Sequence, residues 1–290
     1  NVGTEDQANQ KGMARQKKEK KSLKIGVQFL AYNCKKSFPE FIKPWKKLKD
    51  EYNLYFYVGS CQFPIYANLG YEDNNASTVE MLKNEYSNII DYLYTPSKPK
   101  KEEDLRNKCL EVFKGKGVDL MWVVDSDEFF TEKEICNVLD YVRQNNHIDW
   151  YSLQYKNYVG DGEGWVDFEA PRLWWMNRNK GIRSFHRDCW VIYNNEKECR
   201  QANWKTIPKK IAVPRHMTWV ASFDESRPSD VRAKIRYQNI NYSDGCGFKW
   251  DEKKGELSFN EEWLKTNNKK MPEIHSDEIG IKNKGIKLCE

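Results

Sequence analysis

The residues best suited to chemistry in this chain stand at the end of a short apolar run. Residues 121–124 read Met-Trp-Val-Val, and carboxylates follow at Asp125, Asp127 and Glu128. A continuous apolar run of this length is typical of a buried strand in a parallel sheet, and ligands bind beyond the carboxyl ends of such strands. Side chains two positions apart on an extended backbone project to the same side. Asp125 and Asp127 could therefore share one divalent cation.

A structural alternative exists for the same residues. Crowded carboxylates repel one another unless a cation neutralises them, but an Asp-rich turn in which Asp127 or Glu128 caps the next helix would also account for them. The preceding strand favours the metal site over the cap. Because the ligands are hard oxygens and no thiolate cluster is present, Mn²⁺ or Mg²⁺ is the expected ion.

Strands and helices alternate on the amino-terminal side of this motif. The expected strands are residues 25–31, 54–58, 90–94 and 118–124, and the expected helices lie within 39–51, 78–88 and 102–113. This alternation predicts an α/β fold with a mostly parallel sheet and right-handed crossovers. After the motif we expect a helix over 132–145, an alternating strand over 150–155, a flexible acidic segment at 160–165 and a helix over 230–242.

Bulk composition bounds the class of protein. The chain has 290 residues, of which 39% are hydrophobic and 31% charged, and a net charge of +5. It holds no run of about eighteen apolar residues, so no membrane span is expected. Eight cysteines without a C-x-x-C pair indicate a reducing compartment. We therefore expect a cytoplasmic protein, or a lumenal one only if an upstream anchor has been removed.

The basic residues are clustered. Residues 1–22 are polar and charged without apolar periodicity, which predicts a disordered basic arm. Further clusters occur near residues 43–49 and 205–215. A polyanionic partner or a phosphorylated substrate would suit them. Ordinary solvated faces would account for each cluster equally well.

Four segments together resemble the nucleotide-sugar-dependent glycosyltransferases of the GT-A fold, in particular the family 2-like members. The first is the strand over 24–31 and the loop after it, and the second is Leu105-Arg106-Asn107 at the start of a helix. The third is Val124-Asp125-Ser126-Asp127-Glu128-Phe129, and the fourth is Pro171-Arg172-Leu173 with Lys180-Gly181-Ile182-Arg183. The resemblance covers roughly residues 24–220.

The resemblance implies a Rossmann-like mostly parallel sheet with a mixed, acceptor-side carboxyl-terminal part. Residues 23–128 would form the nucleotide-sugar-binding half and residues 129–245 the acceptor-side half of the same domain, with residues 246–290 as a polar extension. The implied function is metal-dependent transfer of a hexose from a nucleotide-diphosphate sugar, UDP-sugar first, to a glycan or a modified nucleic-acid base such as one in DNA.

Roles for single residues follow from the same resemblance. Asp127 would hold the metal, Asp125 would face the ribose or the metal, and His216 would complete the metal or diphosphate site. Tyr32, Arg106 and Asn107 would contact the nucleotide or diphosphate. For His216 an ordinary, partly buried histidine is the alternative, and for Arg106 and Asn107 it is a solvated helix start.

Two features depart from the family's pattern. Its second strand usually ends in an Asp that reads the nucleobase, whereas residues 57–62 here contain none. No motif identifies the base of an inverting reaction, for which Asp188 is the first choice and Glu163 the second among Asp161, Glu163, Asp167, Glu169 and Asp188. Trp174, Trp175 and Trp190 could stack on a sugar or a base, although tryptophans at this density usually belong to a core.

A second reading comes from another class of protein. The same carboxylates could hold two ions for phosphodiester cleavage, with the basic arm following a nucleic-acid backbone. Nuclease sites usually draw several acidic ligands from separate elements, whereas the sequence offers only the compact D-x-D as a strong cluster. The glycosyltransferase is therefore the preferred reading, and a metal-dependent nucleic-acid-binding protein or nuclease is the alternative.

Overall fold

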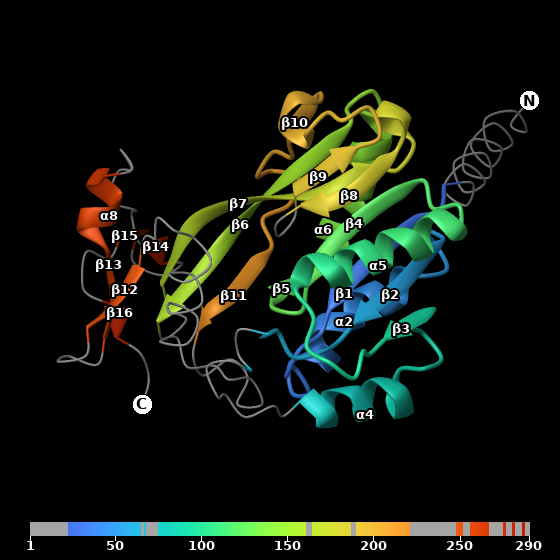
Figure 1. Ribbon diagram of the computed structural model, residues 1–290. Coiled ribbons are helices and arrows are strands. Elements are labelled where there is room, and N and C mark those ends of the chain that lie inside the picture. Colours follow the sequence, from blue (N-terminus) through green and yellow to red (C-terminus); the bar gives the residue numbers. More distant parts are fainter. Residues whose placement is uncertain are drawn as a thin grey trace, which may run out of the picture.

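The structure is a computed structural model of the chain (Figure 1). It describes residues 23–64, 67, 75–160, 164–186, 190–220, 248–251, 256–266, 275–276, 280–281 and 286–287. The predicted basic arm and the predicted helix over 230–242 lie outside the described residues, as do residues 161–163 of the acidic segment at 160–165.

The predicted parallel sheet is present. Strands β1 (Ile25–Leu30), β2 (Leu54–Gly59), β3 (Tyr92–Tyr94) and β4 (Leu120–Asp125) lie in the order β3-β2-β1-β4, and every neighbouring pair among them is parallel. The chain fills the sheet on one side of β1 with β2 and β3, and then returns to add β4 on the other side. The reversal of strand order between β1 and β4 is a topological switch point, where open α/β sheets bind ligands.

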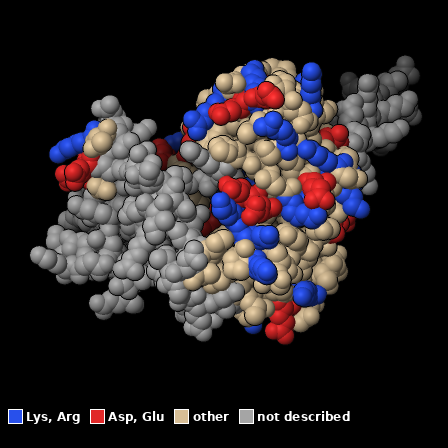
Figure 2. Space-filling view, viewed as in Figure 1, with Lys and Arg blue, Asp and Glu red and all other residues tan. Residues whose placement is uncertain are grey.

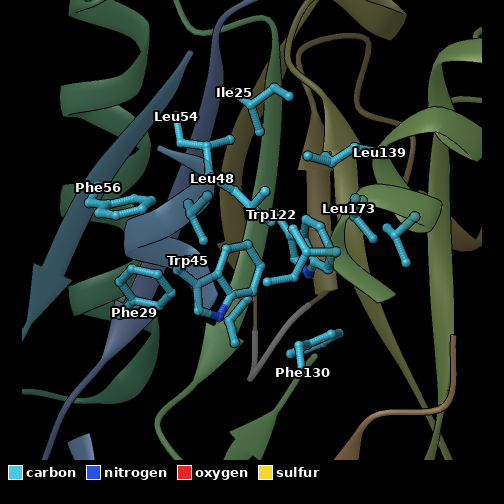
Figure 3. Close-up of a cluster of buried hydrophobic side chains, with 14 of the residues drawn as sticks. Ile25, Phe29, Trp45, Leu48, Leu54, Phe56, Trp122, Phe130, Leu139 and Leu173 are labelled. Atoms are coloured by element: carbon cyan, nitrogen blue, oxygen red, sulfur yellow. The ribbon is translucent and has the colours of Figure 1, made fainter. Parts of the chain in front are cut away.

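Helices cover both faces of this parallel part. They are α2 (Phe38–Leu48), α4 (Asn75–Glu85), α5 (Glu102–Gly115) and α6 (Glu132–Gln144). One core lies under α2 and α6, where Trp45 packs edge-on against Trp122 with ring centroids 4.8 Å apart and both rings contact Phe130 (Figure 3). A second core lies on the α5 side and contains Tyr57, Phe113 and Trp174. Burial of apolar side chains on both faces explains why these strands read as continuous apolar runs.

Beyond β4 the sheet becomes mixed. Strand β7 (Gly164–Trp175) pairs antiparallel with β4 and with β6 (Trp150–Gly160), and β6 pairs parallel with β11 (Arg215–Val220). The two-residue strand β5 (Glu128–Phe129) pairs antiparallel with β11, and β10 (Trp204–Thr206) pairs parallel with β6. The fold is therefore α/β with a mostly parallel sheet, flanking helices and a mixed second part, as the sequence predicted.

Some elements are longer than the sequence predicted, and others were not predicted at all. The strand predicted over 150–155 extends to Gly160, because residues 156–159 continue the ladder with β7 and Gly160 pairs with Val220 of β11. The hairpin of β8 (Ile182–His186) and β9 (Trp190–Tyr193) was not predicted. Pro44 lies within α2, and the helix continues past it to Leu48.

Short elements complete the described chain. They are the 3₁₀ turns η1 (Arg178–Lys180) and η2 (Cys199–Gln201), strands β12 (Phe248–Asp251), β13 (Glu256–Phe259), β14 (His275–Ser276), β15 (Gly280–Ile281) and β16 (Ile286–Lys287), and helix α8 (Glu261–Thr266). None of the five described cysteines forms a disulfide: Cys34, Cys61, Cys109, Cys136 and Cys199. Within the described part of the chain, every helix is too short or too polar to cross a bilayer.

Charged side chains are mixed on the surface. On the face shown in Figure 2, lysines and arginines lie among aspartates and glutamates rather than on a basic face of their own. Several form surface ion pairs, such as Lys47 with Glu132 and Lys209 with Asp167. Exposed pairs of this kind contribute little to stability.

Candidate active site at the strand-order switch point

The acidic motif lies at the switch point. Asp125 is the last residue of β4, and in the parallel register it is level with Leu30, the last residue of β1. Tyr32 lies two residues after the end of β1 and is buried, with its ring centroid 5.6 Å from that of Phe63. The carboxyl ends of β1 and β4 thus bring Tyr32 and Asp125 to the same edge of the sheet, where a ligand is expected.

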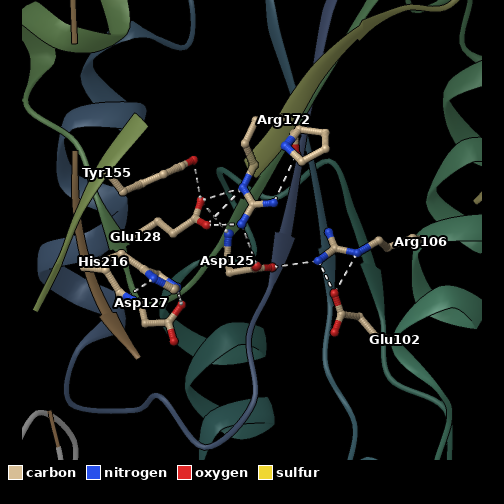
Figure 4. Close-up of polar contacts among 10 residues, drawn as sticks. Glu102, Arg106, Asp125, Asp127, Glu128, Tyr155, Arg172 and His216 are labelled. Carbon is tan, nitrogen blue, oxygen red and sulfur yellow. Dashed lines mark hydrogen bonds and ion pairs between the residues drawn. The ribbon is translucent and has the colours of Figure 1, made fainter. Parts of the chain in front are cut away.

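Asp125 bridges two arginines (Figure 4). Its Oδ1 accepts a hydrogen bond of 3.1 Å from Arg106 on α5, and its Oδ2 accepts one of 3.3 Å from Arg172 on β7. The carboxyl group retains 26% exposure, whereas the Arg106 side chain is wholly buried and also pairs with Glu102, one helical turn earlier. Asp125 is therefore an accessible carboxylate whose orientation is set by two cations behind it.

A β-bulge brings Arg172 to this position. In the pairing of β6 with β7, Tyr151 faces Leu173 and Ser152 faces Pro171, so that Arg172 is the extra residue. The ladder between β4 and β7 also ends at Leu173, so Arg172 lies just outside it. Bulges often redirect a side chain beside a functional site. Here the bulge lets the guanidinium reach both Asp125 and Glu128.

Glu128 is the buried counter-ion of Arg172. Arg172 Nε donates to both carboxylate oxygens of Glu128, at 3.0 and 3.2 Å, and its terminal nitrogen makes a further close contact with Glu128 Oε1. The Tyr155 hydroxyl donates to Glu128 Oε2 at 3.1 Å. Burial, opposed by Arg172, raises the pKa of Glu128 to about 7. Burial and the nearby Glu128 carboxylate raise the pKa of Tyr155, so its hydroxyl stays a donor.

Strand β5 brings Asp127 close to His216. The short β5–β11 ladder places His216 opposite Glu128, and the Met217 amide donates to the Asp127 carbonyl at 2.9 Å. As a result His216 Nε2 lies 3.7 Å from Asp127 Oδ1 (Figure 4). His216 Nδ1 is 3.0 Å from Asn157 Oδ1, and because that oxygen is an acceptor, Nδ1 carries the proton. Nε2 then faces Asp127, and in the neutral imidazole it carries the lone pair.

The helix-cap alternative for the acidic residues does not hold. Thr131 is the N-cap of α6: its hydroxyl accepts from the Glu134 amide, and the Glu134 carboxylate accepts from the Thr131 amide. This capping box satisfies the amino terminus of the helix. Asp127 and Glu128 lie outside it and are directed toward His216 and Arg172 instead.

Asp127 and His216 fit a divalent cation that arrives with a phosphate ligand. Within the described residues, no group of three or more His, Cys, Asp or Glu side chains could hold a metal by itself. Mg²⁺ is usually bound by one or two carboxylates together with substrate phosphates and waters rather than by a complete protein cage. Asp127 and the Nε2 of His216 supply that partial set, with Asn157 orienting the imidazole. Asp125, predicted as a third ligand, directs both oxygens toward arginines.

The other predicted nucleotide-binding residues differ in their surroundings. Arg106 is wholly buried, so as placed it acts on a ligand through Asp125. Asn107 lies apart from the site: its amide donates to the Phe185 carbonyl at 3.3 Å and accepts from the Phe185 amide at 2.7 Å. These paired bonds fasten β8 to α5. The nucleotide-binding roles of Tyr32, Arg106 and Asn107 stay predictions.

The end of β2 carries an amide instead of the acid expected from the family. Ser60 follows the strand, and its hydroxyl pairs with the side chain of Asn75. Asn75 Oδ1 also accepts from the backbone amide of Asn33, which follows Tyr32. A buried polar group therefore joins the ends of β1 and β2, next to the acidic motif.

The predicted catalytic bases, Asp188 and Glu163, lie outside the described residues. Two of the other acids named for that role are described: Asp167 pairs with Lys209 on the surface, and Glu169 accepts from the hydroxyls of Ser152 and Thr206. Trp174 and Trp175 are buried in the two cores. Both tryptophans therefore pack in the protein core.

Three contacts at the site had not been assigned from the sequence. They are the buried Glu128–Arg172 pair, the Tyr155 hydroxyl and Asn157 beside His216. Arg172 belonged to a segment that carried the family resemblance, but nothing in the spacing indicated its partner. Tyr155 and Asn157 lie on β6. The alternating pattern there predicted a strand, but it did not indicate which face of the strand would lie toward Glu128 and His216.

Comparisons with known proteins show similarity in structure only. No protein-family model matches the chain, and no curated protein matches it. The structure is similar to TarS of S. aureus (residues 1–349), also solved with UDP-GlcNAc, at 18% identity and a TM-score of 0.35. That match covers 48% of this chain and 38% of the TarS chain, so this chain spans well under half of it.

A second similar structure is a cytidylyltransferase from Leptospira borgpetersenii serovar Hardjo-bovis (strain JB197). It is 12% identical, with a TM-score of 0.39, over 64% of this chain and 76% of that one. At these scores the resemblance identifies no activity, and the site geometry has to support any functional conclusion.

Proposed function

We propose that this protein is a glycosyltransferase that moves a hexose from a nucleotide-diphosphate sugar to an acceptor. The observation that carries the proposal is the Asp127–His216 pair at the switch point, 3.7 Å apart, beside an accessible Asp125 that two arginines orient. Switch points bind nucleotides in α/β sheets. Two of the sequence segments that resemble the GT-A family, Val124–Phe129 and Pro171–Leu173, supply Asp125, Asp127 and Arg172 of this cluster.

The chemistry of the reaction explains the residue types. When the bond between the sugar C1 and the diphosphate oxygen breaks, negative charge grows on the leaving diphosphate. A divalent ion, Mn²⁺ or Mg²⁺, would neutralise that charge when bound. Asp127 and His216 would hold the ion, and Asn157 would keep the imidazole oriented.

Asp125, oriented by the two arginines, would contact the donor directly. With Arg106 and Arg172 fixed on its two oxygens, the Asp125 carboxylate is held at the end of β4 and would accept hydrogen bonds from the ribose hydroxyls. Tyr32, at the end of β1, would border the nucleotide on the other side. We infer a UDP-sugar as the first candidate donor.

Acceptor activation is assigned to residues outside the described part of the chain. In an inverting reaction one carboxylate would remove the proton of the acceptor hydroxyl. Asp188, two residues after the end of β8, is our first candidate and Glu163 the second. A glycan or a modified DNA base is the proposed acceptor, and the basic arm would favour the polyanionic one.

A nuclease is less well supported by the same site. Two-metal cleavage needs carboxylates that are available to both ions. Glu128 is instead buried against Arg172, and Asp125 contacts two arginines. The arginine side chains of this cluster are thus bonded to the carboxylates that a second metal would require.

Donor binding and hydrolysis test the proposal directly. UDP-glucose and UDP-N-acetylglucosamine are titrated into the full chain with Mn²⁺ and with EDTA, and release of UDP is followed. Asp127→Asn should abolish metal-dependent binding and hydrolysis while keeping the thermal unfolding midpoint, because the carboxylate is a ligand rather than a core group. Asp140→Asn is the matched control, since Asp140 is a half-exposed carboxylate of α6 that pairs with Arg143.

Two results would contradict the proposal. One is wild-type donor turnover by Asp127→Asn. The other is the absence of any nucleotide-sugar binding by the wild-type protein in the presence of Mn²⁺.

A further inference from the structure

A pocket opens on the face of β6 opposite to Tyr155 and Asn157. It has a volume of about 540 Å³ and is lined by Trp150, Ser152, Glu169, Pro171, Trp190, Arg200 and Trp204. Its walls come from β6, β7, β9, β10 and η2, at the end of β6 where β10 pairs with it (Figure 1). Pockets of this size that are mostly aromatic with a few polar groups are typical of small-ligand sites.

Strand register assembles this pocket. Trp204 is paired with Trp150 and Thr206 with Ser152 across β10 and β6, while Pro171 and Glu169 of β7 lie opposite Ser152 and Gln154. Alternate residues of a strand share one face, so the lining side chains of β6 and β10 all project to the same side. Lys205, between Trp204 and Thr206, projects to the opposite side and lies over Tyr141.

The tryptophans form a supported aromatic platform. Trp204 is stacked on Trp150 with ring centroids 5.0 Å apart, and Trp190 meets Trp150 edge-on at 6.1 Å. Arg200 lies over the Trp190 ring at 4.3 Å. Trp150 is 2% exposed, whereas Trp204 keeps 47% of its surface exposed. Trp204 therefore presents a large apolar face that its packing holds in one orientation.

A carboxylate completes the polar part of the pocket. Glu169 Oε1 accepts hydrogen bonds from the hydroxyls of Ser152 and Thr206, the latter at 2.8 Å. Its second oxygen, Oε2, makes no hydrogen bond with any described residue. With Glu169 and Arg200 both in the lining, the opposite charges balance, so the pocket favours neither an anion nor a cation by net charge.

We propose that this pocket binds a neutral saccharide ring. A pyranose has an apolar C–H face that suits an aromatic surface such as Trp204, and a rim of hydroxyls that can donate to Glu169 Oε2 and accept from Arg200. An alkylammonium ion would suit the aromatic walls and Glu169 but would be repelled by Arg200. A flat apolar ligand would offer no hydrogen bond to Glu169 Oε2 or to the Arg200 guanidinium.

The pocket is separate from the donor site. Pro171 lines it, while the next residue, Arg172, reaches Asp125 and Glu128 through the bulge in β7. A saccharide held here would therefore be anchored on the same two strands that position Arg172 and would not contact Asp127. Saccharide binding here requires no nucleotide, so it can be tested independently of the proposed transfer activity.

Binding of defined oligosaccharides tests this proposal. Cellotetraose and chitotetraose are added to the full-length protein without nucleotide or metal, and binding is followed by tryptophan fluorescence and saturation-transfer NMR. Trp204→Ala should weaken binding about ten-fold or more, a loss equivalent to ~1.4 kcal/mol, and Trp204→Phe should restore part of it. Glu169→Gln should also weaken binding, because the amide keeps the shape but loses the charge that strengthens the hydrogen bonds.

Matched controls separate this site from the donor site and from loss of folding. Lys205→Ala alters the neighbouring residue of β10 on the opposite face and should leave binding unchanged, and Asp127→Asn should do the same. Each variant's unfolding midpoint is compared with that of the wild type. Absence of binding by both tetrasaccharides, equal binding by Trp204→Ala at wild-type stability, or preferential binding of tetramethylammonium would overturn the proposal.

Discussion

The Nε2 atom of His216 lies 3.7 Å from Oδ1 of Asp127, although the two residues are far apart in the sequence. Pairing of the short strand β5 with β11 brings them together, and Asn157 on β6 holds the far side of the imidazole. A carboxylate and a neutral imidazole in this relation can share one metal ion. This pair is the basis of the first prediction.

His216→Ala should reduce Mn²⁺-dependent donor affinity more than it reduces stability. Loss of a group that orients a metal ligand typically lowers metal affinity by about 10- to 100-fold. To the packing, His216 contributes ring contacts with Phe168 and Tyr155 and a bond to Asn157. Isothermal titration with UDP-glucose at several Mn²⁺ concentrations measures the effect. His147→Ala, at an exposed position, is the control. Unchanged metal dependence with a lowered melting temperature would remove His216 from the site.

Arg172→Gln should be strongly destabilising, and Arg172→Lys should be intermediate. Removing the guanidinium leaves Glu128 buried without its counter-ion, which costs about 3–5 kcal/mol. Lysine keeps the charge but cannot make the forked contacts with Glu128 and Asp125. Urea unfolding measures both variants beside Arg183→Lys, an exposed arginine of β8. Equal stability of Arg172→Lys and the wild type would show that charge alone suffices.

Glu128 should give stability a pH dependence that Glu128→Gln lacks. Burial raises its pKa from an ordinary value of 4.5 to about 7, so between these values the folded protein holds a proton that the unfolded chain releases. The contribution is present below about pH 4.5 and is lost as the pH rises to about 7, by up to ~3 kcal/mol.

The measurement is urea unfolding of wild type and variant across that pH range. The difference in unfolding free energy, wild type minus Glu128→Gln, should fall as the pH rises. Glu111→Gln, on the surface of α5, should leave the wild-type slope intact. A constant difference between the two proteins would show that the pKa of Glu128 is the same in the folded protein and in the unfolded chain.

Asn107→Ala should lower stability and leave donor affinity unchanged. The variant loses both bonds to the Phe185 backbone and leaves a partly buried amide unpaired, at a cost of about 1–3 kcal/mol. Thermal unfolding and UDP-glucose titration of the same preparation distinguish the roles, with Asn146→Ala as an exposed control. A selective fall in donor affinity would support the nucleotide contact that the family resemblance implies.

Gly26→Ala should destabilise the sheet–helix packing. A Cβ atom at this position of β1 would lie 2.5 Å from the Phe113 ring of α5, closer than side chains approach one another. Overpacking of this kind costs about 1–3 kcal/mol. At Gly115 an added Cβ meets nothing within 4 Å, so Gly115→Ala is the control and should be neutral or slightly stabilising. Equal unfolding midpoints for both variants would show that Phe113 moves aside at no cost.

The alternation of strands and helices was readable from the sequence because it depends on local periodicity. The apolar run before Asp125 indicated β4, and the helix over 102–113 and the strand over 25–31 were confirmed as α5 and β1. The position of the acidic motif at a strand end follows from the same pattern. The α/β class could therefore be predicted, because it depends on the local periodicity of apolar residues.

Contacts at the site were decided by tertiary structure. Arg172 reaches Asp125 and Glu128 only because β7 is bulged and runs antiparallel beside β4. The register of a strand against its neighbour depends on packing of both faces and not on its own residues. The sequence by itself thus determined which carboxylates stand at the end of β4, and tertiary packing decided that Asp125 meets arginines while Asp127 meets His216.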